Sequence, residues 1–293
     1  MQIYLNGQLV SRDDAKISVF DHGFLYGDGV FEGIRVYGGN IFRLEEHIER
    51  LYESARAITL EIPLTQAELI QATVETVAAN GRRDGYIRLV ISRGVGDLGI
   101  DPRKCKRASV VIIVDSIALY PEELYKKGIP LVTASHRRIP ADCLDPRIKS
   151  LNYLNNILAK IEATNAGCPE AIMLNTQGRV AECTADNLFI VKRRVISTPH
   201  LVEGALAGIT RGAVLELARA AGFVTQEGPM TQHDLFTADE CFLTGTGAEI
   251  VPVVAIDGRV IGAGQPGDVT RQLLDAFREL RLKDGTRVDY ASS

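Results

Sequence analysis

The chain has 293 residues, of which 46% are hydrophobic and 24% are charged, as in ordinary globular proteins. Its 33 basic and 37 acidic side chains give a net charge of −4, which offers no cationic surplus for DNA, RNA or anionic lipid. Five scattered cysteines without a C-x-x-C pair predict neither a disulfide framework nor a zinc site, so we expect no bound metal. The length predicts two domains.

The sequence also predicts the cellular compartment of the protein. The first residues, Met1-Gln-Ile-Tyr, carry no basic and apolar secretion signal. The longest aliphatic run, residues 110–114, is far too short to cross a membrane. We therefore expect a cytoplasmic protein that binds neither membranes nor nucleic acid.

The first part of the chain predicts a small α+β domain over residues 1–117. Asn6-Gly7 and Gly38-Gly39 each separate two short apolar runs, which is typical of hairpins. Helical spacing of apolar residues predicts helices over 43–58 and 65–80. Strands are expected at 86–92 and 109–115.

The second part predicts a larger mixed α/β domain over residues 129–293, after an interdomain linker at 118–128 that contains a proline and a charged run. Helices are expected at 151–166, 210–221 and 269–282, and the first has Leu154, Ile157, Leu158 and Ile161 on one face. Strands are expected at 129–134, 171–174, 179–182, 187–191, 240–243 and 251–256. The polar segment after Lys283 is expected to fray.

Several familiar motifs are absent or misleading. Residues 94–99 spell G-x-G-x-x-G, but Pro102 and a basic cluster follow where a dinucleotide site needs a helix, so we expect a glycine-rich loop. The histidines are scattered, and no G-x-S-x-G elbow is present.

Lys149 is the first candidate for chemistry. It precedes the predicted helix at 151–166 and lies between Ile148 and Leu151, where partial desolvation of its amine would favour a Schiff base. Tyr153 follows one turn later and could reach the same site. For a lone lysine, an ordinary solvated side chain near a helix start is the simpler interpretation.

Three further segments could bind an anion or a ring nitrogen. The start of the predicted helix at Gly208-Ile209-Thr210 and the loop at 244–248 offer N–H and hydroxyl groups suited to a phosphate, and Arg50 could add a positive charge. Glu182 lies beside a buried strand, where a carboxylate could keep a pyridoxal nitrogen protonated. Helix caps, turns and a surface salt bridge are the simpler alternatives for each segment taken alone.

In their order, these segments resemble one enzyme family. Tyr26-Gly-Asp-Gly-Val-Phe-Glu-Gly-Ile-Arg35, Glu46-His-Ile-Glu-Arg50, Lys149-Ser-Leu-Asn-Tyr153, Glu182-Cys-Thr-Ala-Asp-Asn187 and Thr244-Gly-Thr246 are similar to the motifs of class IV, fold-type IV pyridoxal-phosphate aminotransferases. The resemblance is strongest to branched-chain amino acid aminotransferases and covers nearly the whole chain. It implies a two-domain fold-type IV enzyme with its site in the cleft between the domains.

The resemblance also implies roles for single residues. Lys149 would form the Schiff base with pyridoxal 5′-phosphate and later transfer the proton. The other implied cofactor contacts are Tyr153 on the phenolic oxygen, Glu182 on the ring nitrogen, Leu206 on the ring face, and Arg50, Ile209, Thr210 and Thr246 on the phosphate. The implied substrate contacts are Tyr26, Phe31, Tyr86, Arg88 and Gly247, of which Arg88 and Tyr26 would receive a carboxylate. Family members form dimers, so Tyr26 could act across a homodimer or higher homo-oligomer.

The implied reaction is transamination of L-leucine, L-isoleucine or L-valine with 2-oxoglutarate, in a ping-pong cycle through pyridoxamine phosphate. D-amino acid transamination and 4-amino-4-deoxychorismate cleavage are alternatives on the same scaffold. A pyridoxal-binding paralogue without activity is a fourth, which the intact set of Lys149, Tyr153 and Glu182 argues against.

Overall fold

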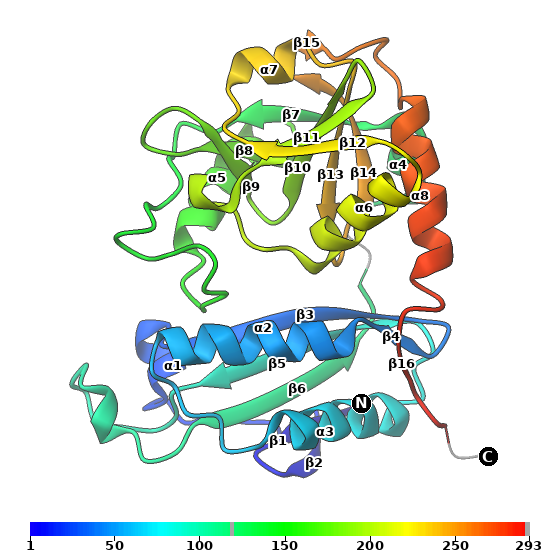
Figure 1. The fold of residues 1–293 in the computed structure, drawn as a ribbon. Coiled ribbons are helices and arrows are strands. Elements are labelled where there is room, and N and C mark those ends of the chain that lie inside the picture. The colour runs from blue at the N-terminus through cyan, green and yellow to red at the C-terminus, as the bar shows by residue number, and fades with distance from the viewer. Residues whose placement is uncertain (118–119, 291–293) are drawn as a thin grey trace. The chain divides into compact units, whose positions relative to one another are not determined.

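The computed structural model describes residues 1–117 and 120–290, which divide into two compact units. Unit 1 contains the described residues 1–117, 148–152 and 281–290, and unit 2 contains 120–147 and 153–280. Each unit has its own sheet, helices and apolar core (Figure 1).

Unit 1 is built on a seven-stranded antiparallel sheet with the strand order β16-β4-β3-β5-β6-β1-β2. Its strands are β1 (Gln2–Leu5), β2 (Gln8–Ser11), β3 (Gly29–Tyr37), β4 (Asn40–Phe42), β5 (Gly85–Ser92), β6 (Ser109–Asp115) and β16 (Gly285–Arg287). Its helices are α1 (His22–Tyr26), α2 (Leu44–Ala57), α3 (Gln66–Ala79) and the 3₁₀ turn η1 (Pro102–Lys104).

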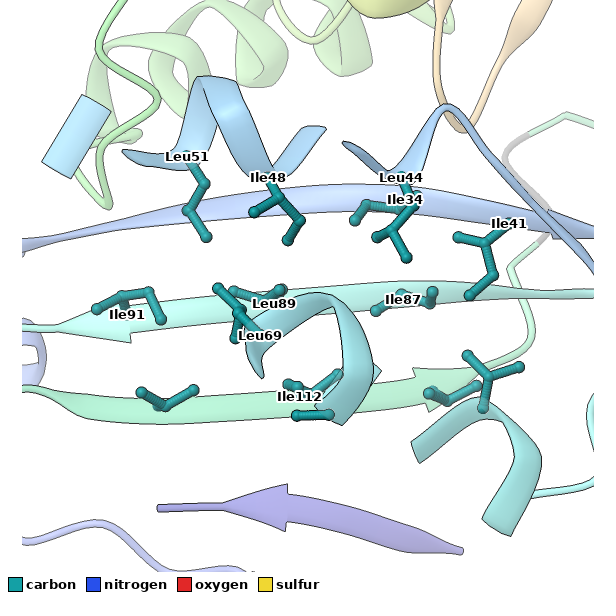
Figure 2. Packing of buried hydrophobic residues seen from close by; sticks show 14 of the residues in the cluster. Ile34, Ile41, Leu44, Ile48, Leu51, Leu69, Ile87, Leu89, Ile91 and Ile112 are labelled. Atoms are coloured by element: carbon teal, nitrogen blue, oxygen red, sulfur yellow. The ribbon is translucent and has the colours of Figure 1, made fainter. Parts of the chain in front are cut away.

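The core of unit 1 lies between this sheet and the helices α2 and α3. Figure 2 shows Leu44, Ile48 and Leu51 of α2 directed toward the apolar side chains of the strands. Successive strand residues point to opposite faces, so Ile87 and Leu89 of β5 enter this core and leave Tyr86 and Arg88 on the other face. The sheet therefore has one helix-covered face and one face available for polar chemistry.

Local sequence signals account for several boundaries in unit 1. Asn6 and Gly7 both adopt positive φ, 51° and 99°, as a tight hairpin between β1 and β2 requires, which confirms the first predicted hairpin. Thr65 and Glu68 form a capping box that starts α3 one residue after the predicted position.

The glycine-rich segment at 94–99 is a loop, as predicted, and only the three-residue turn η1 lies between it and β6. Gly94 has φ 92°, and a Cβ there would lie 1.9 Å from the carbonyl oxygen of Arg107. This glycine therefore serves a close approach of two backbone segments.

Unit 2 is built on a nine-stranded mixed sheet with the order β12-β11-β10-β13-β14-β7-β8-β9, in which β15 also pairs with β14. Its strands are β7 (Ile129–Thr133), β8 (Glu170–Leu174), β9 (Val180–Cys183), β10 (Asn187–Lys192), β11 (Val195–Pro199), β12 (Val224–Gly228), β13 (Glu240–Gly245), β14 (Glu249–Ile256) and β15 (Arg259–Val260). Its helices are α4 (Glu122–Lys127), α5 (Leu154–Asn165), α6 (Ile209–Ala220), α7 (Gln232–Phe236), α8 (Asp268–Leu280) and the 3₁₀ turn η2 (Leu201–Glu203).

The sheet of unit 2 curls, because β9 at the end of the strand order also contacts β10 and β11. The core contains aliphatic side chains from β7, β8, β10, β13 and β14. Phe189 and Phe242 stack nearby, with ring centroids 5.0 Å apart. None of the helices in the described part of the chain combines the length and hydropathy needed to cross a bilayer.

The structure divides the chain differently from the sequence-based boundaries. Residues 122–127 of the expected linker form α4, which packs on β14 in unit 2, whereas residues 118–119 lie outside the described residues. Residues 148–152 belong to unit 1, as do residues 281–290. The segment after Lys283 does not simply fray, since β16 pairs with β4 in register from Gly285 to Arg287.

The helix α5 also differs from its prediction. It begins at Leu154, so Lys149 and Tyr153 are not on one helix and the expected one-turn spacing is not realised. Its apolar face is exposed rather than buried, with Leu154 66% exposed and Ile157 and Ile161 each 50% exposed. The face that packs on the sheet carries Asn156, Ala159 and Ala163 instead, because small side chains let the helix approach the strands closely.

Candidate active site

Lys149 is held in unit 1 by backbone pairing with β3. The amide of Phe31 donates to the carbonyl of Lys149 at 2.9 Å, and the amide of Leu151 donates to the carbonyl of Gly29 at 2.9 Å. The amide of Lys149 itself donates to the hydroxyl of Ser54 on α2 at 3.1 Å. The backbone of Lys149 is therefore fixed at both its carbonyl and its amide group.

Three of the expected substrate residues gather around this lysine. Lys149 Nζ lies 4.6 Å from the ring centroid of Phe31, and the guanidinium carbon of Arg88 lies 4.6 Å from the same centroid. Arg88 also lies 5.3 Å from the ring centroid of Tyr86. Phe31, Tyr86, Arg88 and Lys149 thus form one cluster within unit 1.

Gly33 makes room for this cluster. It pairs directly with Arg88 across β3 and β5, and a Cβ at this position would lie 1.9 Å from the hydroxyl of Tyr86. Any side chain larger than hydrogen at Gly33 would push the ring of Tyr86 out of its present position.

Tyr26 has a different environment. It ends the short helix α1, its side chain is 40% exposed, and its hydroxyl donates to the carbonyl of Leu98 at 2.5 Å. Its ring meets that of His22 edge to face at 5.2 Å. These contacts anchor Tyr26 to the glycine-rich loop and leave part of its ring accessible.

Arg50, expected at the phosphate, forms a buried ion pair. Its Nε and Nη2 each donate to the Glu32 carboxylate at 2.7 Å, and Nδ1 of His47 contacts the same carboxylate at 2.8 Å. Burial alone would raise the pKa of Glu32, but the Arg50 cation and the His47 contact outweigh it and hold that pKa well below its ordinary value. Burial lowers the pKa of His47, so its imidazole is neutral and donates Nδ1–H to Glu32.

In unit 2, Glu182 lies on β9 and is 5% exposed. Its carboxylate accepts from Arg138 Nη2 at 2.7 Å, from Asn187 Nδ2 at 2.9 Å and from the amide of Leu206 at 3.0 Å. Arg138 is fixed in turn, because its Nε donates to the carbonyl of Gly204 at 3.0 Å. These donors hold the carboxylate in a fixed orientation.

Asn187 joins Glu182 to the other expected cofactor segments of unit 2. Its Nδ2 also donates to the carbonyl of Leu206 at 2.9 Å, and its backbone pairs with Thr244 between β10 and β13. A Cβ on Gly208 would lie 2.1 Å from Asn187 Oδ1, so a glycine is required there.

Two groups of donors in unit 2 suit an anion. The residue preceding α6, Gly208, provides no side-chain cap, so the first amides of that helix, which include those of Ile209 and Thr210, have no such acceptor. Thr246 and Gly247 form the tight turn between β13 and β14. Tyr153, also in unit 2, is half-buried and immediately precedes α5.

Sequence reasoning missed four residues of this arrangement. Arg138, Glu32 and His47 were assigned no role, and Asn187 was only part of a motif. A signal existed for Glu32, because it occupies a core-facing position of β3 between Val30 and Ile34. Arg138 follows Arg137 in an irregular segment, and no spacing distinguishes it.

No group of three or more histidine, cysteine, aspartate or glutamate side chains that could hold a metal occurs among the described residues.

Comparison with known families decides which enzymes this geometry resembles. The model of the class IV aminotransferases matches residues 29–256. The chain belongs to this family. The match takes in the Lys149 segment, Glu182, the start of α6 and the turn at Thr246.

Relatives within the family match nearly end to end. A Methanocaldococcus jannaschii protein with the provisional name branched-chain-amino-acid aminotransferase is 54% identical over 98% of this chain and 99% of its own length. The branched-chain-amino-acid aminotransferase of Pseudomonas aeruginosa is 39% identical, covering 95% of this chain and 92% of that protein. D-alanine aminotransferase of Bacillus licheniformis is 37% identical, covering 97% and 98%.

Solved structures agree with this aminotransferase assignment. The branched-chain aminotransferase of Escherichia coli superposes with a TM-score of 0.93 at 35% identity, over 96% of this chain and 94% of that one. The branched-chain amino acid aminotransferase of Thermobaculum terrenum in its PLP-bound form gives 0.87 at 34% identity, over 95% and 93%. The expected fold-type IV class is therefore confirmed.

Proposed function

We propose that this chain catalyses transamination of L-branched-chain amino acids with 2-oxoglutarate, using pyridoxal 5′-phosphate. The observation that carries the proposal is the cluster of Lys149, Phe31 and Arg88 in a chain that is similar over nearly its whole length to branched-chain aminotransferases. The cluster combines an amine, an apolar wall and a carboxylate partner, which are the groups that this reaction requires.

The residues present fit the cofactor. Glu182, whose carboxylate accepts from Arg138, Asn187 and the amide of Leu206, is a suitable acceptor for a protonated ring nitrogen, and Lys149 supplies the amine for covalent attachment. We assign the phosphate to Arg50, to the start of α6 at Ile209 and Thr210, and to Thr246. Leu206 is assigned to the ring face and Tyr153 to the phenolic oxygen.

When bound, pyridoxal phosphate draws electrons from the substrate Cα into its protonated ring, which makes the Cα proton removable. In this assignment Glu182 keeps the proton on the ring nitrogen. The Lys149 amine takes the proton from the substrate Cα and holds it for return. Its backbone pairing with β3 fixes the point from which the lysine side chain extends.

Substrate selection is assigned to the other face of the unit 1 sheet. Phe31, Tyr86 and the turn at Gly247 would contact a branched aliphatic side chain. Arg88, on the same face, would receive the second carboxylate of glutamate, with help from Tyr26. A cation stacked on aromatic rings can leave them without breaking a buried ion pair, so one site can accept both kinds of side chain.

The Lys149→Ala variant tests the assignment. We expect the visible absorption of the cofactor-loaded protein to disappear and transfer of the amino group from L-leucine to 2-oxoglutarate to be abolished, with circular dichroism unchanged. Lys106→Ala changes an exposed lysine of unit 1 and serves as the matched control. Full activity of Lys149→Ala would refute the assignment.

D-amino acid transamination is the second candidate, because the D-alanine enzyme matches the chain over nearly its full length. Adding L-leucine and D-alanine separately to the loaded protein distinguishes the two. We expect L-leucine to bleach the cofactor absorption. Bleaching by D-alanine alone would favour D-amino acid transamination instead, and release of pyruvate from added 4-amino-4-deoxychorismate without an amino acceptor would indicate the lyase.

We also propose a homodimer. Two groups of large apolar side chains are exposed: one is the apolar face of α5, and the other lies around α1 and its neighbouring loop and includes Phe24, Leu98 and Ile100. Exposed apolar groups of this kind are typical of protein–protein interfaces. Tyr26 lies at the second of these groups, where a partner could use it. All five cysteines are free thiols, which supports the proposed cytoplasmic location.

A further inference from the structure

Glu32 occupies a position of β3 that should be apolar. Its neighbours on the same face of the strand, Val30 and Ile34, are completely buried in the unit 1 core, and Glu32 is 0% exposed as well. Figure 2 shows Ile34 facing Leu44 and Ile48 of α2. A carboxylate in such a place is unfavourable unless charged partners surround it.

The partners come from α2 and form a polar stripe on that helix. His47, Arg50 and Ser54 follow at helical spacing beside the apolar residues Ile48 and Leu51. His47 and Arg50 contact Glu32, and Ser54 accepts the backbone amide of Lys149. One stripe of one helix is thus fixed both to β3 and to the segment that carries the lysine.

The pairing with Glu32 is side-on. Arg50 uses Nε and Nη2, each at 2.7 Å, so the planar guanidinium is fixed in orientation and its Nη1 group is directed away from Glu32. His47 contributes Nδ1 to one carboxylate oxygen, which keeps that oxygen from turning away. His47 is 0% exposed and its Nε2 has no hydrogen-bond partner among the described residues, so the only polar contact of its ring is the one to Glu32.

We propose that Glu32 and His47 are positioning residues that hold the Arg50 guanidinium at a fixed place relative to Lys149, as a preformed anchor for the cofactor phosphate. The inference rests on the proposed function, in which Arg50 binds that phosphate. In pyridoxal phosphate the aldehyde and the short CH2–O arm that carries the phosphate are attached to adjacent carbons of a rigid ring, so the distance between aldehyde and phosphate varies little. A lysine that binds the aldehyde and an arginine that binds the phosphate must therefore keep a nearly constant separation. In this chain, Lys149 and Arg50 are both fixed to β3 and α2.

Comparison of two cofactors tests this role. Pyridoxal lacks the phosphate but keeps the aldehyde, so the ratio of the dissociation constants of pyridoxal and pyridoxal phosphate measures the phosphate anchor alone. Because both constants come from the same variant of the apo-protein, a general loss of stability cancels in the ratio. We expect Arg50→Ala to reduce this preference for the phosphate about 100-fold and Glu32→Gln to reduce it about 10-fold.

Three further variants sharpen the test. In the double variant Glu32→Gln/Arg50→Ala, the preference should equal that of Arg50→Ala alone, because Glu32 acts only through the arginine. His47→Asn should keep most of the preference, since the Asn amide can replace the Nδ1–H donor, whereas His47→Leu should lose it. Glu49→Gln removes an exposed carboxylate from the same helix and is the matched control.

The outcomes distinguish the assignment of Arg50 to the phosphate from the positioning role of Glu32 and His47. An unchanged preference in Arg50→Ala would refute the assignment of Arg50 to the phosphate. A reduced preference in Arg50→Ala with an unchanged one in Glu32→Gln would refute only the positioning role. An additive loss in the double variant would also refute it, because Glu32 would then act independently of Arg50.

Discussion

Glu162 shows how one carboxylate can stabilise a loop and make the fold sensitive to acid. From α5 it accepts hydrogen bonds from the amide of Ser135 at 2.6 Å and from the amide of His136 at 3.1 Å, and it also contacts the His136 ring. Burial would raise its pKa, but these hydrogen bonds outweigh burial and lower the pKa of Glu162 from 4.5 to about 2.

The lowered pKa predicts the pH at which this contribution is lost. A group with a depressed pKa in the folded state stabilises the fold above its ordinary pKa and ceases to do so as the pH falls through the folded value. We expect Glu162→Gln to lower the free energy of unfolding by about 1 kcal/mol at pH 7, a figure reduced for solvent screening, with the difference vanishing between pH 4.5 and about pH 2. Urea titrations across this range measure it, and a difference that is the same at pH 3 and pH 7 would contradict the prediction.

Single residues also show what a sequence can reveal of a site. Lys149, Glu182 and Thr210 stand in motifs whose order is informative even though each residue alone is ambiguous. Glu32 could have been found as a charge at a core-facing position of a strand. Arg138 could not, because its contact with Glu182 joins residues 44 positions apart and depends on its segment running beside β8, the strand that pairs with β9.

At the scale of elements, strands and helices with strong local signals were predicted well. The hairpin at Asn6-Gly7 and the capping box of α3 are encoded within a few residues. The short strands β11 and β12 were missed because their pairing comes from tertiary contacts rather than from an alternating pattern. The apolar face of α5 was predicted from the helical spacing. Periodicity alone does not indicate what an apolar face packs against.

The exposed face of α5 carries the homodimer prediction. Leu154, Ile157, Leu158 and Ile161 recur at the spacing of one helical face and are all at least 36% exposed. Replacement of Ile157 and Ile161 by Glu places two charges on that face without disturbing the buried Ala159 and Ala163. We expect the variant to sediment as a monomer where the unmodified chain sediments as a dimer.

The control for this experiment is Asn165→Glu, which adds a charge to an exposed position at the end of the same helix. It should leave sedimentation unchanged. A dimer that survives the paired substitution at Ile157 and Ile161 would place the interface elsewhere, with the apolar surface around Phe24 as the next candidate.

At the scale of the whole molecule, the chain divides into two compact units and contributes three separate segments to unit 1. Residues 148–152 belong to unit 1 because their backbone groups pair with the edge of β3. Residues 285–287 belong to unit 1 because they form β16, which pairs with the edge of β4. An ion pair between Arg43 and Asp284, at 2.7 Å, supports this pairing. Composition and length cannot predict that later segments of the chain join unit 1. This pairing depends on strand edges that exist only in the folded sheet.

The pairing of β16, near the end of the chain, with β4, near its beginning, has a consequence for folding during translation. A nascent chain that has produced only residues 1–117 holds most of unit 1, yet β4 still has an open edge and the partner of β3 at residues 149–151 has not been made. Open strand edges are sites of wrong pairing in partly folded chains. On the ribosome, the first unit to be translated is therefore among the last to be finished, and chaperone binding to it should persist until residue 287 has emerged.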